Sequence, residues 1–397
     1  MTARIKSGLN IDPANQEHGK PSPKDLQDLG ASWVRFVFKV RKGSPEALKA
    51  AFNAYDGYIS ALKDEGIEIL LILNNESVPN WPVDRPNADD AAWQAYRPRF
   101  AESCEKIARH YQGKVNAYQI WNEPDFHAPR PDYNPTLSPA VFGQMLKLSH
   151  AAIKGVNPEI GVVIGGLASG QPHWLDWVKA ASDNKLYADA VGVHPYGRRP
   201  TPDWPTPDWG GLGPMKDLLQ AYADRARPLP LWISEMGTED GHYQGEFPEK
   251  AYDALNRTLA GDAPLAFWFC WSDGMVNGFG LRDKSGKKKK AYDSYQRFAR
   301  QATREAAAKS TVEAQPRLRT ALLKEAARRH LLTLDTNTAL AGRIIADGFM
   351  PNSAEFGLEI AGVHYRAQRA DDPATGKTRI YYARGPRWQP VGFVERP

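Results

Sequence analysis

Eight short apolar segments recur along the first 300 residues, separated by stretches whose apolar residues follow a helical spacing. Most of these segments are continuously apolar, which is typical of parallel strands covered on both faces. The expected strands are Ile5–Ile11, Trp33–Phe38, Ile67–Leu73, Val115–Trp121, Gly161–Ile164, Ala190–His194, Leu231–Ser234 and Leu265–Trp271. Eight strand–helix units in this length predict an α/β fold, a (β/α)8 TIM barrel over residues 1–300.

A doubly wound open sheet would show the same alternation of strands and helices. It is disfavoured because no glycine-rich dinucleotide fingerprint follows the first strand. Gly165 and Gly166 lack the required spacing and predict a tight turn instead. Three Ser-Pro pairs, Ser22-Pro23, Ser44-Pro45 and Ser138-Pro139, each predict the start of a helix, with serine as the N-cap.

The character of the sequence changes after residue 300. Residues 301–316 are rich in Ala, Glu and Lys, end at Pro316 and predict a helical linker. A basic amphipathic helix and four strand-like segments then predict a small α+β domain over residues 317–397. The expected strands are Phe356–Ile360, Val363–Gln368, Arg379–Ala383 and Val391–Val394.

The composition is that of an ordinary globular protein, with 42% hydrophobic and 24% charged residues among 397. No apolar run reaches the roughly 18 residues of a membrane span, and the N-terminus lacks a secretory signal. A cytoplasmic, a phage-associated and a secreted location with the signal removed all remain open. The net charge is +5, and its densest run, Lys287–Lys290, is expected to be a solvated loop. We therefore expect neither a nucleic-acid partner nor a membrane span.

Two glutamates directly follow apolar strands that lie across the mouth of the expected barrel. Glu123 follows Ile120-Trp121-Asn122, and Glu235 follows Ile233-Ser234. Barrel enzymes carry their reactive side chains at the C-terminal ends of the strands. Glycoside hydrolysis needs two carboxyl groups, one protonated and one ionised, beside the bond that breaks. The pair therefore indicates a glycosidase rather than ordinary charged strand ends.

These segments resemble the strand-four and strand-seven motifs of glycoside hydrolase clan A, whose members are retaining (β/α)8 glycosidases. Within the clan, family 39 is the closest resemblance and family 5 a near alternative, over about residues 5–300. The resemblance implies that Glu123 is the general acid/base and Glu235 the nucleophile. It also implies that Asn122 hydrogen-bonds the 2-hydroxyl of the sugar.

Four further positions match the clan. Arg35 resembles the arginine that keeps the nucleophile ionised, and Tyr196 the tyrosine that orients Glu235. For His194 the resemblance implies substrate binding or support of the glutamate pair, and a purely structural role remains open. Trp271, at the end of the eighth strand, is implied to form the platform under the sugar.

The long segment after the sixth strand contains Trp204 and Trp209. Outer sugar subsites and a proline-stiffened lid anchored by these tryptophans are both open. The sequence contains no zinc-binding, P-loop or Gly-x-Ser-x-Gly motif. We therefore expect no metal and no cofactor.

Together these features predict a retaining β-glycoside hydrolase that acts on a poly- or oligosaccharide through a glycosyl-enzyme intermediate. The rival is a non-catalytic carbohydrate-binding or scaffold protein on the same barrel, since fold does not fix function. The C-terminal domain departs from the β-sandwich often appended in family 39. It either binds a cell wall or anionic glycan or packs against a neighbouring domain, and the aromatic residues concerned are Tyr365, Tyr381, Tyr382 and Trp388.

Overall fold

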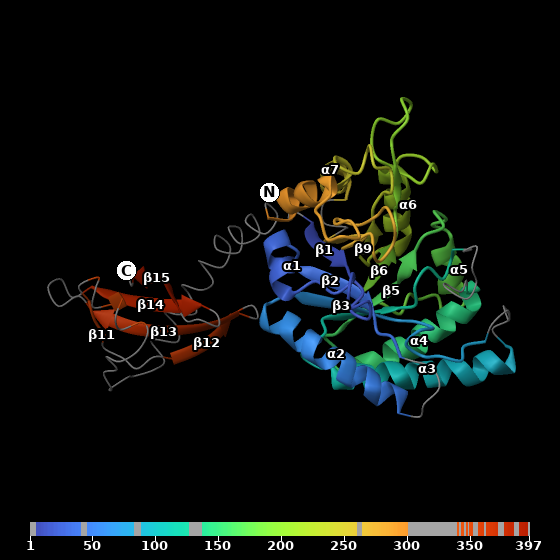
Figure 1. The fold of residues 1–397 in the computed structure, drawn as a ribbon. Helices are drawn as coiled ribbons and strands as arrows, with labels where there is room; N and C mark the ends of the chain where they lie inside the picture. Colours follow the sequence, from blue (N-terminus) through green and yellow to red (C-terminus); the bar gives the residue numbers. More distant parts are fainter. Residues whose placement is uncertain are drawn as a thin grey trace. The chain divides into compact units, whose positions relative to one another are not determined.

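The computed structural model describes residues 5–40, 46–82, 89–126, 137–259 and 264–300, and beyond them 340, 343–344, 347, 349–351, 356–360, 363–371, 377–384 and 389–395. The chain divides into two compact units, residues 1–306 and 307–397 (Figure 1). Three predicted features lie outside the described residues: the linker over 301–316, the basic helix that follows it, and the cap at Ser44-Pro45.

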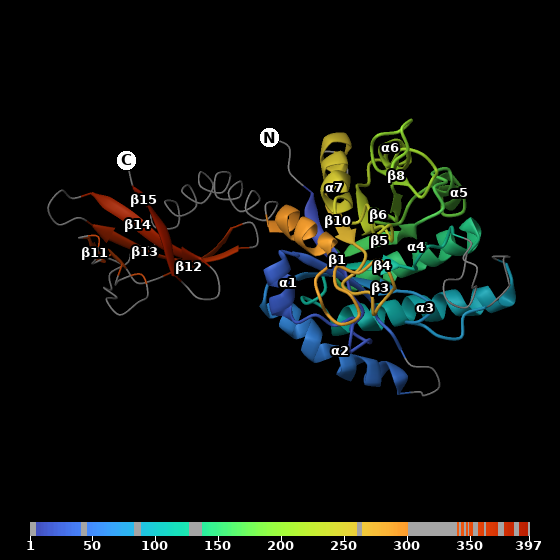
Figure 2. The ribbon, with the colours of Figure 1, turned by 45° about the horizontal axis from the view of Figure 1, so that its top comes forward.

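Eight parallel strands of the first unit close into a barrel in the order β1-β10-β9-β6-β5-β4-β3-β2 (Figures 1 and 2). They are β1 (Lys6–Asn10), β2 (Trp33–Val37), β3 (Glu68–Leu73), β4 (Ala117–Ile120), β5 (Gly161–Leu167), β6 (Ala190–Val193), β9 (Leu231–Met236) and β10 (Leu265–Trp268). The first strand pairs with both β2 and the last strand β10, which excludes the open sheet. The predicted (β/α)8 barrel is confirmed.

Helices surround the barrel on the outside (Figure 2). They are α1 (Pro23–Leu29), α2 (Ala47–Asp64), α3 (Ala91–His110), α4 (Pro139–Val156), α5 (Trp174–Ala180), α6 (Met215–Ala226) and α7 (Phe247–Thr258), and residues 290–300 are also helical. Ser22 and Ser138 cap α1 and α4 as predicted, accepting hydrogen bonds from the backbone N–H groups of Asp25 and Val141. Within the described residues, no helix combines the length and the apolar character that crossing a bilayer requires.

Three lysines of the run, Lys287, Lys288 and Lys289, lie on the loop after β10, and Lys290 begins the helix that follows. Lys287, Lys288 and Lys290 are exposed, as expected. Lys289 differs, because its ammonium group donates to both carboxylate oxygens of Asp273 at 2.9 and 3.0 Å and to the carbonyl of Gly278. One lysine of the run therefore fastens this loop instead of facing solvent.

An apolar cluster fills the barrel near the N-terminal ends of the strands. Trp33 contacts Trp232 and Phe267 edge-on, with ring centroids 5.4 and 6.4 Å apart. Leu70, Ala117, Val163, Ala190 and Leu265 complete the cluster. Gly8 of β1 gives Phe267 its space, since a Cβ atom there would lie 2.3 Å from the ring. Apolar side chains thus fill the interior near the N-terminal ends of the strands, and polar groups gather nearer to the C-terminal ends.

The second unit contains an antiparallel sheet in the order β11-β13-β14-β15, with β12 paired to β13. The strands are β11 (Met350–Pro351), β12 (Phe356–Ile360), β13 (Val363–Asp371), β14 (Thr378–Arg384) and β15 (Gln389–Glu395). All four expected strands are present. Helical residues Leu340 and Ile344 pack with Phe349, Ala370, Tyr381 and Ala383 in a small core.

Two of the aromatic residues considered for glycan binding are buried in this unit. Tyr381 belongs to its core, and Tyr365 is also buried. Tyr382 is half-buried, and Trp388 lies outside the described residues. Tyr365 and Tyr381 therefore do not form an exposed sugar platform.

Two glycines give a matched test of the packing. In Gly8→Ala the new methyl group collides with the enclosed Phe267 ring, so we expect the free energy of unfolding to fall by about 1–3 kcal/mol. Gly57 is exposed on α2 with open space around it. Gly57→Ala should therefore raise the free energy of unfolding by about 0.5–1 kcal/mol. Urea unfolding of both variants measures the two changes, and equal changes would contradict the packing described.

Candidate active site

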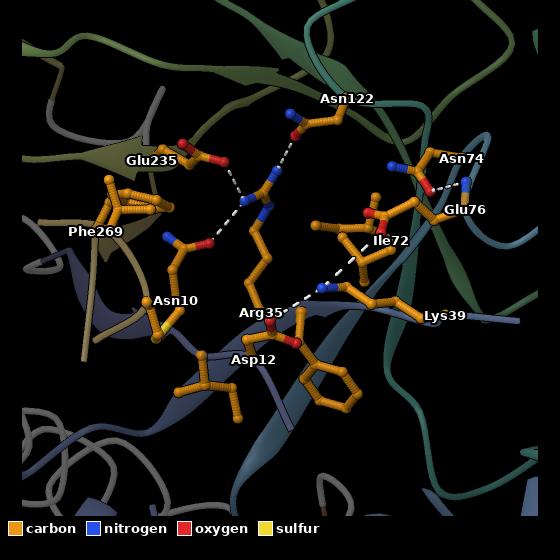
Figure 3. Close-up of a pocket in the computed structure, with 15 residues that line it drawn as sticks. Asn10, Asp12, Arg35, Lys39, Ile72, Asn74, Glu76, Asn122, Glu235 and Phe269 are labelled. Carbon is orange, nitrogen blue, oxygen red and sulfur yellow. Dashed lines mark hydrogen bonds and ion pairs between the residues drawn. The ribbon is translucent and has the colours of Figure 1, made fainter. Parts of the chain in front are cut away.

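Arg35 of β2 lies at the centre of the polar groups above the apolar cluster (Figure 3). The residue is 1% exposed. The guanidinium donates to the side-chain oxygens of Gln119 at 2.9 Å and of Asn10, Asn122 and Glu235 at 2.6 Å each. A buried charge is costly unless it is paired and hydrogen-bonded. Arg35 meets both conditions through partners from three other strands or strand ends.

Glu235 of β9 is held at both carboxylate oxygens. Arg35 donates to Oε1, and the hydroxyl of Tyr196 donates to Oε2. Burial raises the pKa of Glu235, but the electrostatic attraction of His194 and Arg35 and the hydrogen bonds from Tyr196 and Arg35 outweigh it. The net pKa lies below its ordinary value, so this carboxyl group is ionised near neutral pH.

Glu123 follows β4 in an unusual backbone conformation. Both Trp121 and Glu123 have positive φ, 67° and 46°, a region that residues with side chains seldom adopt. The backbone N–H of Glu123 donates to the carbonyl of Gly165 at 2.8 Å. A Cβ atom at Gly165 would lie 2.8 Å from the carbonyl of Ile120. The bare glycine backbone therefore lets the end of β4 approach β5 closely enough to orient Glu123.

His194, directly after β6, connects the two glutamates. Its Nδ1 lies 2.8 Å from Oε1 of Glu123 and 3.7 Å from Oε2 of Glu235. Its ring occupies the space beside Gly166, where a Cβ atom would lie 2.2 Å from Nε2 and where φ is +61°. Gly165 and Gly166 belong to strand β5, so the expected tight turn is wrong. The two glycines instead make room for Glu123 and His194.

The carboxyl groups of Glu123 and Glu235 are close neighbours. One oxygen of each and a ring nitrogen of His194 all lie within 4.8 Å of one another. Such a set offers enough ligand atoms for a metal ion. However, the guanidinium of Arg35 already contacts Glu235 at 2.6 Å and would repel a second cation. The set is better suited to two carboxyl groups in different protonation states.

A pocket opens beside Glu235 and Asn122 toward the loops that follow β1, β2 and β3 (Figure 3). Its lining includes two aromatic residues, Phe36 and Phe269, but not Trp271, which was expected there. Trp271 is 7% exposed and packs in the core with the guanidinium of Arg282 4.7 Å above its ring. Strand β10 ends at Trp268, so the alternation of faces cannot be extended along the chain to Trp271.

The tryptophans of the segment after β6 do not behave alike. Trp209, in β8 (Asp208–Trp209), which pairs with β7 (Gly197–Arg198), is 3% exposed and stacks on Tyr222 of α6. It is therefore an anchor of the loop, and the sugar-subsite interpretation is wrong for it. Trp204 is half-buried.

Sequence reasoning missed three residues at the site. Gln119 is a polar residue inside an apolar buried strand, which was the signal that could have identified it. Its amide also donates to the carbonyl of Trp121 at 2.9 Å. Asn10 donates to the carbonyls of Ser234 and Trp268. Phe269, the third, had no signal that separated it from the other aromatic residues of its strand.

The fold is shared with solved glycoside hydrolase structures. A family 39 glycoside hydrolase from Bacteroides cellulosilyticus WH2 is 16% identical with a TM-score of 0.54, covering 97% of this chain and 71% of its own. A GH5-4 broad specificity endoglucanase from Clostridium acetobutylicum is 13% identical with a TM-score of 0.54, covering 75% and 99%. A GH30 endoxylanase from Clostridium papyrosolvens C71 is 13% identical with a TM-score of 0.52, covering 96% and 82%.

No protein-family model matches the sequence, and no curated protein matches it. At these identities the solved structures establish the fold alone. The expected resemblance to clan A is therefore confirmed for the barrel architecture.

The pairing of Arg35 with Glu235 predicts a pH-dependent loss of stability. Arg35→Met leaves a buried carboxylate unpaired, so we expect the free energy of unfolding at pH 7 to fall by about 3–5 kcal/mol. The lowered pKa of Glu235 stabilises the native protein above the ordinary value of 4.5, and this contribution is lost as the pH falls through the native pKa. In the variant, which lacks the ion pair with Arg35, we expect burial to raise the pKa of Glu235. Its carboxyl group then takes up a proton as the pH falls, and the buried charge disappears. The difference from wild type should therefore shrink on acidification.

Urea unfolding between pH 4 and pH 7 provides the measurement. Combining Arg35→Met with Glu235→Gln removes both charges and should recover part of the loss. A loss below about 1 kcal/mol, or one that does not change with pH, is inconsistent with a buried ion pair.

Proposed function

We propose that this protein is a retaining β-glycoside hydrolase that acts on a poly- or oligosaccharide. The observation that carries the proposal is the pair Glu123 and Glu235, with carboxylate oxygens within 4.8 Å at the C-terminal end of the barrel. Retaining glycosidases place their carboxyl groups about 5–5.5 Å apart, and inverting ones about 6.5–9.5 Å. The shorter separation favours attack by a carboxylate rather than by a water molecule held between the groups.

Glu235 is proposed as the nucleophile because it is ionised and held at both oxygens. Its carboxylate attacks the anomeric carbon, and the bond to the leaving oxygen breaks as that oxygen takes the proton of Glu123. A water molecule then attacks the same carbon, gives its proton to Glu123 and releases Glu235 as a carboxylate. The two steps together consume one water and restore both groups.

The surrounding residues have proposed positioning and binding roles. Arg35 and Tyr196 hold Glu235, and Nδ1 of His194 lies within hydrogen-bond distance of Glu123, at 2.8 Å from Oε1. The carbonyl oxygen of Asn122 accepts from Arg35, which turns its amide N–H groups toward a sugar hydroxyl. Residues 1–300 form the proposed catalytic domain, and residues 317–397 are proposed as an accessory domain that binds a cell-wall or anionic glycan.

Paired glutamine variants test the assignment on 4-nitrophenyl β-glycosides of xylose, glucose and mannose and on the corresponding oligosaccharides. Glu235→Gln should abolish turnover of every substrate. Glu123→Gln should lower the rate on oligosaccharides by about 10²–10⁴-fold, because their leaving groups need a proton. It should spare the first step, measured as kcat/KM, for 2,4-dinitrophenyl glycosides, because their leaving group departs without a proton.

Glu249→Gln provides the matched control, because this glutamate is exposed on α7 and should have no effect. Wild-type rates on oligosaccharides in either active-site variant would refute the assignment. Glycan binding by the wild-type protein without release of reducing ends would favour the non-catalytic alternative.

A further inference from the structure

The pocket beside Glu235 continues away from the glutamate pair into three loops. Asp12 follows β1, Lys39 follows β2 and Glu76 follows β3, and all three line the pocket. Lys39 and Glu235 lie at opposite ends of the view in Figure 3. The pocket therefore extends from Glu235 to the three loops that carry these charged residues.

Lys39 stands between two carboxylates. Its ammonium group donates to Oδ2 of Asp12 at 2.9 Å and lies 3.9 Å from Oε1 of Glu76. An ammonium group has three N–H donors, and within the described residues only the one toward Asp12 is used in a side-chain hydrogen bond. We refer to Asp12, Lys39 and Glu76 as the charged triad.

The triad is partly accessible. The side chains of Lys39, Asp12 and Glu76 are 33%, 25% and 41% exposed. Burial raises the pKa of Glu76, and the attraction of Lys39 opposes that rise. Burial lowers the pKa of Lys39, but the attraction of Asp12 and Glu76 raises it by more than burial lowers it. The net pKa of Lys39 therefore lies above its ordinary value. The side chains thus present one charged donor between two acceptors, an array that matches the adjacent hydroxyl groups of a sugar ring.

The net charge of the pocket is negative. Arg35 and Glu235 compensate each other, and the triad carries two carboxylates for one ammonium group. A sugar that carries a carboxylate would be repelled here, whereas an uncharged sugar would not.

The residues that line the pocket indicate which part of the substrate it would hold. The leaving group must lie beside the general acid, Glu123, which does not line this pocket. The nucleophile Glu235 and Asn122 do line it. On the proposed function, the pocket therefore holds the part of the substrate that stays bound to Glu235.

We propose that Asp12, Lys39 and Glu76 form a subsite for an uncharged, hydroxyl-bearing sugar unit, one unit beyond the ring attacked by Glu235. The substrate then presents at least a disaccharide on this side of the bond that breaks. This inference rests on the proposed function and adds its substrate class.

Matched aryl glycosides test the subsite, with the full chain and three pairs of 4-nitrophenyl β-linked probes: xyloside and xylobioside, glucoside and cellobioside, mannoside and mannobioside. On the pair that the wild type hydrolyses, Lys39→Met should lower kcat/KM for the disaccharide about tenfold, equivalent to about 1.4 kcal/mol. The monosaccharide probe should change less than twofold, which also shows that the variant is folded.

Lys20→Met is the matched control, since Lys20 is a half-buried lysine that does not line this pocket. It should leave both probes unchanged. An equal effect of Lys39→Met on the two members of a pair, or none on either, overturns the subsite while leaving the proposed function intact. Failure of the wild type to hydrolyse any probe refutes the proposed function itself.

The charge of the triad is tested with an acidic counterpart of the same disaccharide. In the cellobioside and the mannobioside, C6 of the non-reducing unit is oxidised to a carboxylate, and in the xylobioside a glucuronate replaces the non-reducing xylose. Wild type should hydrolyse this acidic probe at least tenfold less efficiently than the neutral one. Glu76→Gln removes one negative charge and should narrow the difference. Equal efficiency of wild type on the two probes overturns the preference for an uncharged unit.

Discussion

A single buried guanidinium organises the candidate site. Arg35 has nothing but donors, so each of its hydrogen bonds fixes an acceptor, and its acceptors come from β1, from β4 and the residues after it, and from β9. Without those acceptors the guanidinium charge of Arg35 could not remain buried. Only a closed barrel brings these strands around one side chain. The contacts that keep Glu235 ionised therefore depend on the closure of the barrel, which the pairing of β1 with β10 completes.

Much of the fold could be predicted because continuous apolar runs mark buried strands wherever they occur. The candidate glutamates could also be predicted from the sequence, since each directly follows such a run. The geometry around them could not be predicted. The sequence predicts a turn at Gly165 and Gly166. Their role in making space becomes apparent only in the folded chain, where Ile120 and His194 lie beside them. Close approach between distant segments leaves no local pattern in a sequence.

The aromatic residues near the site show a second limit of prediction from sequence. Side chains of a strand alternate between its two faces, which would place Phe267, Phe269 and Trp271 on the same face. The alternation holds only while the chain remains a strand, and β10 ends at Trp268. Phe269 consequently lines the pocket, and Trp271 is buried beneath Arg282. The charged triad was missed for a related reason. Its members lie on three separate loops, and the sequence of one loop does not indicate which residues of the other two lie beside it.

The central claim is that two carboxyl groups this close act on opposite sides of one anomeric carbon, with Glu235 attacking it directly. Proton NMR of the first anomer released from a β-linked substrate tests that claim, provided spectra are recorded before mutarotation. Two successive displacements predict that the β-anomer appears first and the α-anomer accumulates slowly afterwards. Initial release of the α-anomer would mean a single displacement by water and would contradict the account.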